Sequence, residues 1–129
     1  MTATLPWSHV LAVAIGAAVG ALARWFAGLW LNGQWAGFPL GTLLVNCVGG
    51  LLIGMALAWF ERTPDEFLRV LLVTGFLGGL TTFSSFSGES LILLQRGEHG
   101  MALLHTGAHL FGSLGFAALG LVGLRAMLD

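Results

Sequence analysis

Four long apolar stretches dominate this sequence and limit what it can fold into. They cover about residues 10–31, 40–60, 67–94 and 101–127, with short polar segments between them. Each is long enough to cross a hydrocarbon layer of ~30 Å as a helix that rises ~1.5 Å per residue. Charged residues make up only 9% of the chain, whereas soluble domains carry about 25%. We therefore predict an all-α membrane protein in which residues 1–129 form one domain of four transmembrane helices.

Composition also excludes several classes of function. The chain has five arginines, no lysine and six acidic residues, so it offers no basic surface for nucleic acid. Cys47 is the single cysteine, which excludes an intrachain disulfide and a paired-cysteine metal site. Neither a phosphate-binding glycine loop nor a G-x-S-x-G nucleophile motif is present, so we predict that the protein is not an enzyme. The N-terminus lacks a basic segment and a cleavage site, so we expect no cleaved signal peptide.

The third apolar stretch does not have the sequence of a plain membrane helix. Its central part, Thr74–Ser90 (TGFLGGLTTFSSFSGES), contains three glycines within five residues, and these are followed by six hydroxyl side chains together with Phe83, Phe86 and Glu89. Such polar residues are tolerated at membrane depth only where they face protein or water. The stretch, at about 28 residues, is also longer than one straight span needs. A helix broken mid-span, near Gly75–Thr82, accounts for both the length and the glycines.

Polar side chains in the other stretches mark further candidate positions. Thr42 and Asn46 lie one helical turn apart, and a membrane amide needs a partner: either another helix or a permeating anion. His105 and His109 have the i,i+4 spacing of a metal-binding pair, but the sequence shows no third ligand nearby, which favours neutral imidazoles on a polar face. Arg24 is about two turns from the end of its helix and is expected to reach towards water.

The broken stretch allows several interpretations. Phe83 and Phe86 share one helical face, where core packing is the usual role; however, ring edges are electropositive. Beside hydroxyl and amide donors, such edges would suit a small anion that must also be released. Carbonyls freed by a helix break bind water or cations such as Na⁺. Glu89 is either hydrated near the end of its span, or a pore-mouth or proton-linked carboxylate.

The arginines do not fix the orientation in the membrane. Both termini are expected on one side of the membrane, together with Arg62, Arg69 and Arg125. The opposite side carries Arg96, and Arg24 lies near its edge. Because this asymmetry is small, a single orientation and a dual topology are equally supported by charge. Four spans enclose little volume, and glycines occur on several faces, which indicates an oligomer with sites between subunits.

Two motifs, GTLLVN (Gly41–Asn46) and TGFLGGLTTFSSFS (Thr74–Ser87), closely resemble the CrcB/Fluc family of fluoride channels. The resemblance extends over essentially the whole chain, including the Gly112–Ser113 pair. It implies a fluoride-selective channel of the bacterial inner membrane, which exports toxic fluoride from the cytoplasm by passive electrodiffusion. It also implies an antiparallel, dual-topology homodimer with two fluoride pathways, and a structural Na⁺ at the dimer centre that is not transported.

The resemblance further assigns roles to individual residues. It implies that Asn46 donates to fluoride with Thr42 beside it, and that Phe83 and Phe86 present ring edges along the pathway. By the same resemblance, Arg24 matches the family's first-span arginine near the vestibule, Glu89 its polar-track carboxylate and Ser113 its fourth-span serine. The backbone carbonyls that hold the Na⁺ match those of Gly78 and Thr81.

The fourth stretch departs from some relatives, which carry a tyrosine and a serine where this chain has His105 and His109. His109 is retained as a pathway residue. Since the unperturbed pKa of histidine is about 6.5, the two imidazoles could make conduction pH-sensitive. This hypothesis fails if replacing both histidines leaves the pH profile of fluoride flux unchanged.

Two other classes of function are consistent with four spans. A small proton-coupled multidrug antiporter would need a central carboxylate, for which Glu89 is the candidate, although it lies towards one end of its span. A structural or assembly protein without transport would explain the glycines, but it would leave Asn46 and the two phenylalanines without a role.

Overall fold

The computed structural model describes residues 4–35 and 37–129, and these contain helices and turns without any strand. In chain order the elements are α1 (Trp7–Leu31), α2 (Leu40–Arg62), α3 (Glu66–Arg69), the π-helical η1 (Val70–Leu77), α4 (Gly78–Leu80), α5 (Phe83–Gln95) and α6 (His99–Leu128). Four helical units are long and apolar enough to cross a membrane: α1, α2, the compound helix Glu66–Gln95 and α6. The chain is thus a multi-pass membrane protein, which confirms the predicted helical class and number of spans.

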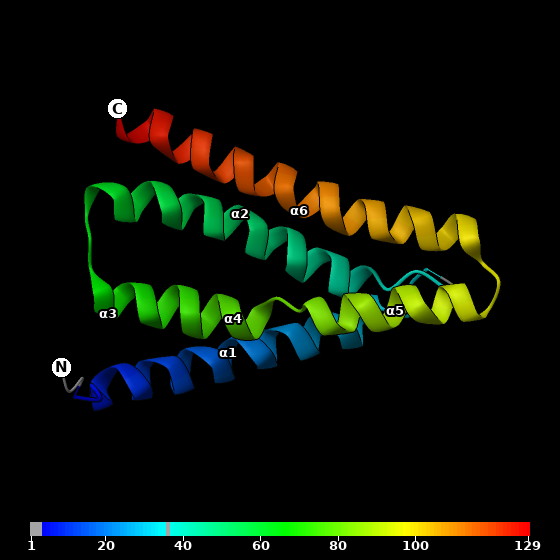
Figure 1. Ribbon diagram of the computed structural model, residues 1–129, viewed down its shortest axis with the longest axis horizontal. Helices are drawn as coiled ribbons and strands as arrows, with labels where there is room; N and C mark the ends of the chain where they lie inside the picture. The colour runs from blue at the N-terminus through cyan, green and yellow to red at the C-terminus, as the bar shows by residue number, and fades with distance from the viewer. Residues whose placement is uncertain (1–3, 36) are drawn as a thin grey trace.

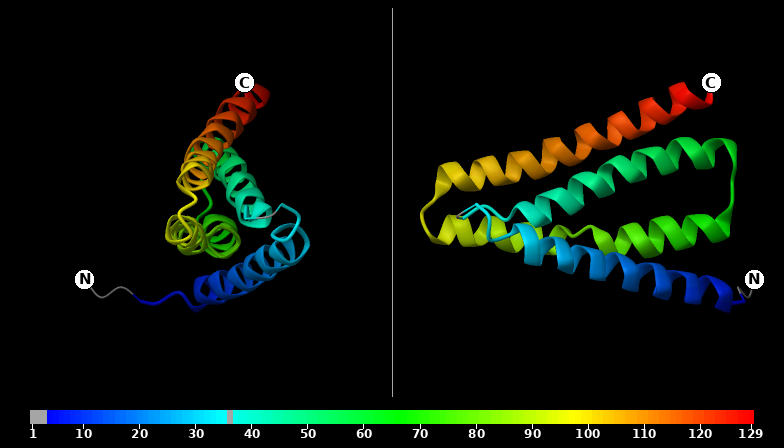
Figure 2. Two further views of the ribbon diagram at one scale, coloured as in Figure 1. Left: turned by 90° about the vertical axis from the view of Figure 1, so that its right-hand side faces the viewer. Right: turned by 180° about the vertical axis from the view of Figure 1, so that it is seen from behind.

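The four helical units lie side by side, with α6 and α1 outermost and α2 and the compound helix between them (Figures 1 and 2). The most extensive contacts join α2 to α6, and α1 to η1 and α4. The start of α1 and the end of α6 lie at the same end of the molecule (Figure 1), as an even number of spans requires. Many large apolar side chains are exposed along α1, α2 and α6, so their outer faces depend on lipid or another protein for cover.

The predicted break in the third span is present but is limited to two residues. Thr81 (φ −86°, ψ 156°) and Thr82 (φ −151°, ψ 117°) are extended, and the chain between α4 and α5 leaves the helical path there (Figure 1). Thr82 then caps α5, because its hydroxyl accepts a hydrogen bond from the Ser85 N–H at 3.0 Å. The interruption therefore begins after the glycine-rich part of the predicted range.

Gly75 and Gly79, which precede the break, remain helical and serve a different purpose from the predicted one. A Cβ placed on Gly75 would lie 3.2 Å from the Cα of Gly16, and one placed on Gly79 would lie 3.0 Å from the Cα of Ala17. These small residues let α1 approach the compound helix closely, as in other membrane helix pairs. The glycine signal thus indicates helix packing, whereas the threonines make the break.

Side chains also fix the two ends of the bundle. At one end, Asn32 Oδ1 accepts hydrogen bonds from the N–H groups of Gly41 (2.8 Å) and Thr42 (3.2 Å), which caps the start of α2. At the end that holds the termini, α2 and α6 are joined by two ion pairs, Arg62–Asp129 and Arg125–Glu61. The pairs and the cap hold α2 in register with its neighbours.

Candidate functional site

A groove of about 740 Å³ runs along one face of the molecule beside the helix break. Its walls come from α2, the compound helix and α6, and they are largely apolar with a few hydroxyl, amide and imidazole groups. Seven predicted site residues line it: Asn46, Gly78, Thr81, Phe83, Phe86, His109 and Ser113. The structure therefore brings together most of the residues that the sequence selected, from three separate spans.

Asn46 pairs with the peptide of Thr82 in the break. Its Oδ1 accepts from the Thr82 N–H at 2.8 Å, and its Nδ2 donates to the Thr82 carbonyl at 3.0 Å. The break takes this N–H and this carbonyl out of the helical ladder, and a buried peptide group without partners would be costly. Asn46 therefore satisfies the broken backbone across two helices, the first of its two predicted roles.

The second amide hydrogen of Asn46 is also engaged, because Nδ2 lies 3.1 Å from Nδ1 of His109. An amide nitrogen has two hydrogens, and both now point at acceptors within the chain. The direct donation to an anion that was predicted for Asn46 would require one of these hydrogen bonds to break.

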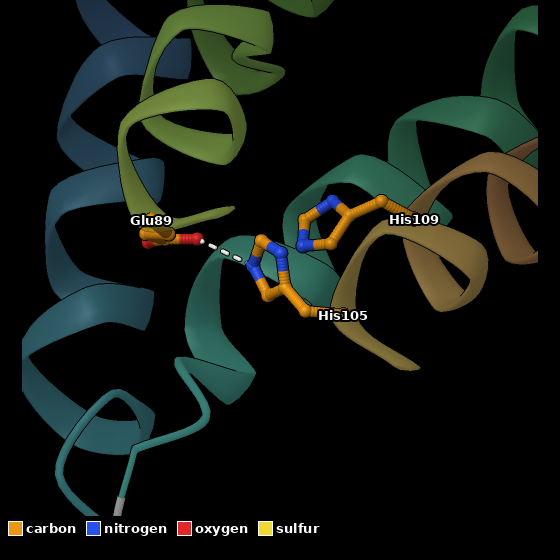
Figure 3. A group of neighbouring side chains, drawn as sticks. All are labelled: Glu89, His105 and His109. Atoms are coloured by element: carbon orange, nitrogen blue, oxygen red, sulfur yellow. Dashed lines mark hydrogen bonds and ion pairs between the residues drawn. The ribbon is translucent and has the colours of Figure 1, made fainter. Parts of the chain in front are cut away.

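His109 carries the unpaired nitrogen of the site. It is 4% exposed, and within residues 4–35 and 37–129 its Nε2 is the one buried side-chain polar atom without a hydrogen-bond partner. Leaving such an atom unpaired costs about 1–3 kcal/mol. The unpaired atom lies on the side of the ring that faces His105 (Figure 3), so it belongs to the Glu89–His105–His109 cluster behind the groove wall.

Thr42 and Glu89 belong to a hydrogen-bonded chain that does not line the groove. The Glu89 carboxylate accepts from the Thr42 hydroxyl at 2.6 Å and lies 3.0 Å from Nε2 of His105. On its other side, His105 Nδ1 is 2.8 Å from the Ser90 hydroxyl, which lies 3.1 Å from that of Thr106. Each of these groups has a partner, so the interior chain is satisfied from end to end.

The ring of Phe86 lies against both the interior chain and the groove wall, and the His105 and His109 rings contact each other directly, with their centroids 4.5 Å apart. His105 is fully buried. The Phe86 ring is stacked on it, with ring centroids 5.5 Å apart, and the Phe38 ring lies edge-on, with centroids 5.3 Å apart. The Phe86 ring also contacts the ring of His109, with centroids 4.6 Å apart, and that of Phe83, edge to face, with centroids 5.5 Å apart. Phe83 is 79% exposed. Phe86 is thus a shared wall, while Phe83 extends outwards along the groove.

Sequence reasoning overlooked Ser90 and Phe38 as contributors to this arrangement. In the sequence Ser90 is one hydroxyl among six, and its pairing with His105 joins α5 to α6 across their connecting loop. Phe38 lies in the loop before α2, and no pattern in the sequence placed it against α6. The proximity of Ser90 to Glu89 in the sequence was the one signal that could have suggested a shared network.

Arg24 does not reach towards the end of its helix as predicted. Its Nε donates to the carbonyl of Gly79 at 3.0 Å, an acceptor that the break deprives of a helical N–H partner. The capping of α4 by a neighbouring helix outweighs the gain from extending the guanidinium to water. Arg24 therefore stabilises the break and lies outside the lining of the groove.

The carbonyls of Gly78 and Thr81 differ from their neighbours in the break. Those of Gly79 and Thr82 accept hydrogen bonds from Arg24 and Asn46, whereas no side chain of the described residues donates to Gly78 or Thr81. Gly78 is exposed and faces open space, since a Cβ there would meet a single atom within 4 Å. Two carbonyls beside the groove are thus of the type that Na⁺ prefers.

Glu89, His105 and His109 also form a compact cluster, with His105 between the other two (Figure 3). One ligand-type atom from each lies within 4.8 Å of the others. The sequence lacked a third ligand for the histidine pair, and Glu89, sixteen positions before His105, is the residue that folding brings to it. Two imidazoles and a carboxylate are a known ligand set for zinc, so the protonation of these groups decides what the cluster binds.

Comparison with known proteins identifies similar chains over nearly the full length. A family described as "CrcB-like protein, Camphor Resistance (CrcB)" matches residues 11–121. A protein of Bordetella petrii, named fluoride-specific ion channel FluC, is 54% identical over 129 residues, which cover 98% of this chain and 99% of the relative. A protein of the same name from Pseudomonas aeruginosa is 50% identical, and the match covers 95% of this chain and 98% of the relative. Another, from Aromatoleum aromaticum, is 52% identical, and the match covers 90% of each chain.

Proposed function

Because this chain belongs to the CrcB family, which matches it over residues 11–121, we propose that it is a fluoride channel of the bacterial inner membrane. Its named relatives are fluoride-specific ion channels, in agreement with the prediction that the protein is not an enzyme. Fluoride that enters a cell as HF from acidic surroundings dissociates in the less acidic cytoplasm and is trapped there as the anion. An inside-negative potential drives a monovalent anion outwards with ~2.3 kcal/mol per 100 mV, so passive electrodiffusion suffices for export.

The observation that carries this proposal is a groove whose donors are neutral. Its polar side chains are hydroxyl, amide and imidazole groups, which come from Thr81, Thr82, Thr106, Ser113, Asn46 and His109. No lysine, arginine or acid lines it in the described part of the chain. Neutral donors and the ring edges of Phe83 and Phe86 bind an anion weakly enough to release it, as conduction requires. We assign the fluoride path to this groove.

Three residues that the sequence also predicted for the path receive supporting roles in this proposal. Thr42 and Glu89 hold His105 in the interior chain, and Arg24 caps the break. Arg24 bonds to the carbonyl of Gly79 just before the break, whereas Thr42 and Glu89 are connected to the groove wall through His105, whose ring contacts those of Phe86 and His109. They would shape the path without lining it.

We also propose that two copies assemble as an antiparallel, dual-topology homodimer. The groove is open along one face of a single chain, and fluoride conduction requires walls on all sides. A second copy inserted in the opposite direction would present its own groove-side surface and exposed apolar residues. One Na⁺, which is not transported, would then be held at the dimer centre by the carbonyls of Gly78 and Thr81 from both copies, consistent with the exposure of Gly78.

The proton-coupled antiporter is less well supported by the geometry. Its exchange carboxylate would have to bind protons and substrate in turn, whereas Glu89 already accepts hydrogen bonds from Thr42 and His105 and lies outside the groove lining. A groove with neutral donors suits an anion better than the cationic drugs that such antiporters export.

Ion efflux from liposomes tests the proposed function directly. Purified protein is reconstituted at about one dimer per vesicle, and the vesicles are loaded with equal fluoride and chloride. We expect fast, electrogenic fluoride loss that follows the imposed potential, with negligible chloride loss. Equal leakage of both anions, or retention of both, would contradict the proposal.

A further inference from the structure

The ring of His109 is oriented for its Nδ1 atom rather than for Nε2. Nδ1 lies 3.1 Å from the amide nitrogen of Asn46, whereas Nε2 is buried without a hydrogen-bond partner and faces the ring of His105 (Figure 3). Turning the ring over would place a carbon atom against the Asn46 amide. Because buried polar atoms are normally paired, an orientation that leaves Nε2 unpaired indicates that the contact of Nδ1 with Asn46 decides how the ring lies.

The hydrogen bond between Asn46 and His109 has one possible direction. The peptide of Thr82 fixes the Asn46 amide, because its N–H donates to Oδ1 at 2.8 Å and its carbonyl accepts from Nδ2 at 3.0 Å. The second hydrogen of Nδ2 is therefore the one that points at His109, and Nδ1 is its acceptor. His109 thus contributes a lone pair to this contact.

The acceptor on His109 completes the support of the helix break. Thr82 is extended (φ −151°, ψ 117°), and Asn46 supplies the partners that its peptide lost when the third span left the helical path. The last torsion of an asparagine side chain is broad, and an unpaired amide hydrogen at membrane depth is costly. Without His109, the second hydrogen would draw the amide towards another acceptor and away from Thr82.

We propose that His109 is a positioning residue, which acts through Asn46 to hold the peptide of Thr82 in the conformation that shapes the groove wall. Thr81, Thr82 and Phe83 are consecutive lining residues, so this peptide places two hydroxyls and one aromatic ring along the groove. The inference rests on the proposed function for the statement that the groove conducts fluoride, but the contacts that carry it lie within the chain. His109 needs no contact with the ion to affect conduction.

Aromatic contacts hold the His109 ring in the orientation that this role requires. The Phe86 ring lies against it, with centroids 4.6 Å apart, and the His105 ring contacts it, with centroids 4.5 Å apart. Both nitrogens of His105 already have hydrogen-bond partners other than Asn46. His109 is therefore the imidazole that serves Asn46, and His105 does not duplicate it.

Two replacements of His109 separate the acceptor from the ring. The δ-oxygen of asparagine can take the position of Nδ1 and accept from Asn46, whereas leucine fills the space without a polar atom. We expect His109→Leu to lower fluoride efflux from liposomes by about tenfold to 100-fold, the factor that corresponds to one buried donor left unpaired. His109→Asn should stay within about threefold of wild type. Equal losses in the two variants, or no loss in either, would overturn the proposal.

Hydrogen exchange of the Thr82 N–H, followed by NMR in detergent, tests the same contact without reference to transport. In His109→Leu this N–H should exchange about tenfold faster or more, because Asn46 no longer holds its partner in place. In wild type and in His109→Asn it should be protected.

The N–H of Thr81 is the matched control for the exchange experiment, since it bonds to the Leu77 carbonyl at 3.0 Å and does not involve Asn46. Its exchange should be the same in all three proteins. If the Thr81 and Thr82 N–H groups exchanged faster by the same factor in His109→Leu, the ring would only stabilise the fold and the positioning role would be wrong.

The two claims fail separately in these experiments. If wild-type liposomes release no fluoride but Thr82 alone exchanges faster in His109→Leu, the proposed function is wrong and the positioning role of His109 stands. If fluoride efflux is fast but the Thr82 N–H is equally protected in all three proteins, the channel stands and this role of His109 is wrong.

Discussion

The interior chain and the groove wall use similar side chains, but they differ in how completely these are paired. Around Glu89, the Thr42 hydroxyl and the His105 imidazole each have a partner, and the chain continues through Ser90. One turn further along α6, the otherwise similar His109 keeps a buried Nε2 without any partner. Buried polar groups are normally satisfied, so His105 fits a structural role, whereas His109 keeps an unmet hydrogen-bonding requirement in a residue that lines the groove.

The largest expected effect comes from Asn46→Asp, which replaces the amide that bonds to both Thr82 and His109 in the groove wall. The carboxylate cannot donate to the Thr82 carbonyl, and its charge repels fluoride next to the path. Leaving a charge beside the path should destabilise the permeating fluoride by about 3–5 kcal/mol. Because ~1.4 kcal/mol corresponds to a factor of ten, fluoride flux should fall at least 100-fold. The measurement is liposome efflux, with size-exclusion chromatography as a check that the assembly is unchanged. Flux equal to wild type would remove Asn46 from the path.

The next effect should fall on stability, in the interior chain. His105→Leu removes a hydrogen-bond donor from the part-buried Glu89 carboxylate, and we expect the free energy of unfolding to drop by about 1–3 kcal/mol. Thermal unfolding in detergent measures the change.

The matched control for this substitution is Ser90→Ala, which removes only a hydroxyl at the far side of the His105 ring. It should cost less than His105→Leu. If His105→Leu instead abolished fluoride efflux while the protein remained as stable as wild type, the structural role of His105 would be wrong.

Much of the fold could be predicted from the sequence, because the signals are local. Apolar length gave the four spans, and the run of hydroxyls after glycines placed the break to within a few residues. The function of the glycines was misjudged because Gly75 and Gly79 are explained by α1, which is far away in the sequence. Local pattern indicates that a small residue is needed, but not whether a turn or a neighbouring helix needs it.

The candidate site could be predicted by residue but not by pairing. Asn46 and His109 were both predicted as site residues. Neither spacing nor composition could show that the Asn46 amide is hydrogen-bonded to the backbone of Thr82 and to the imidazole of His109. The same holds for Glu89, which becomes the third member of the histidine cluster only when α5 and α6 fold back on each other. Which polar group is left unpaired depends on tertiary structure.

A smaller effect is expected in the packing that positions the break. Gly79→Ala would place a methyl group against the backbone of Ala17 in α1, and overpacking of this kind costs about 1–3 kcal/mol. Because Gly79 also offers its carbonyl to Arg24, a displaced α1 should reduce flux as well as thermal stability. Gly88→Ala is the control within the same span, since a Cβ there meets nothing within 4 Å of this chain. Equal losses in both variants would show that α1 does not hold the break in place.

The smallest effect concerns the ion pairs between α2 and α6, at the end of the molecule that is remote from both polar regions. Glu61 and Arg125 are solvent-exposed, with their side chains 51% and 45% accessible, and exposed pairs are strongly screened by salt. We therefore expect Arg125→Ala to leave fluoride efflux unchanged and to lower the melting temperature slightly at low ionic strength, with no difference from wild type in 1 M salt. The double variant Glu61→Ala/Arg125→Ala should melt close to Arg125→Ala, because the partner charge is lost either way. A flux change in either variant would mean that the C-terminal end of α6 is coupled to the groove. The different roles of His105 and His109 could then not be explained by their own hydrogen bonds alone.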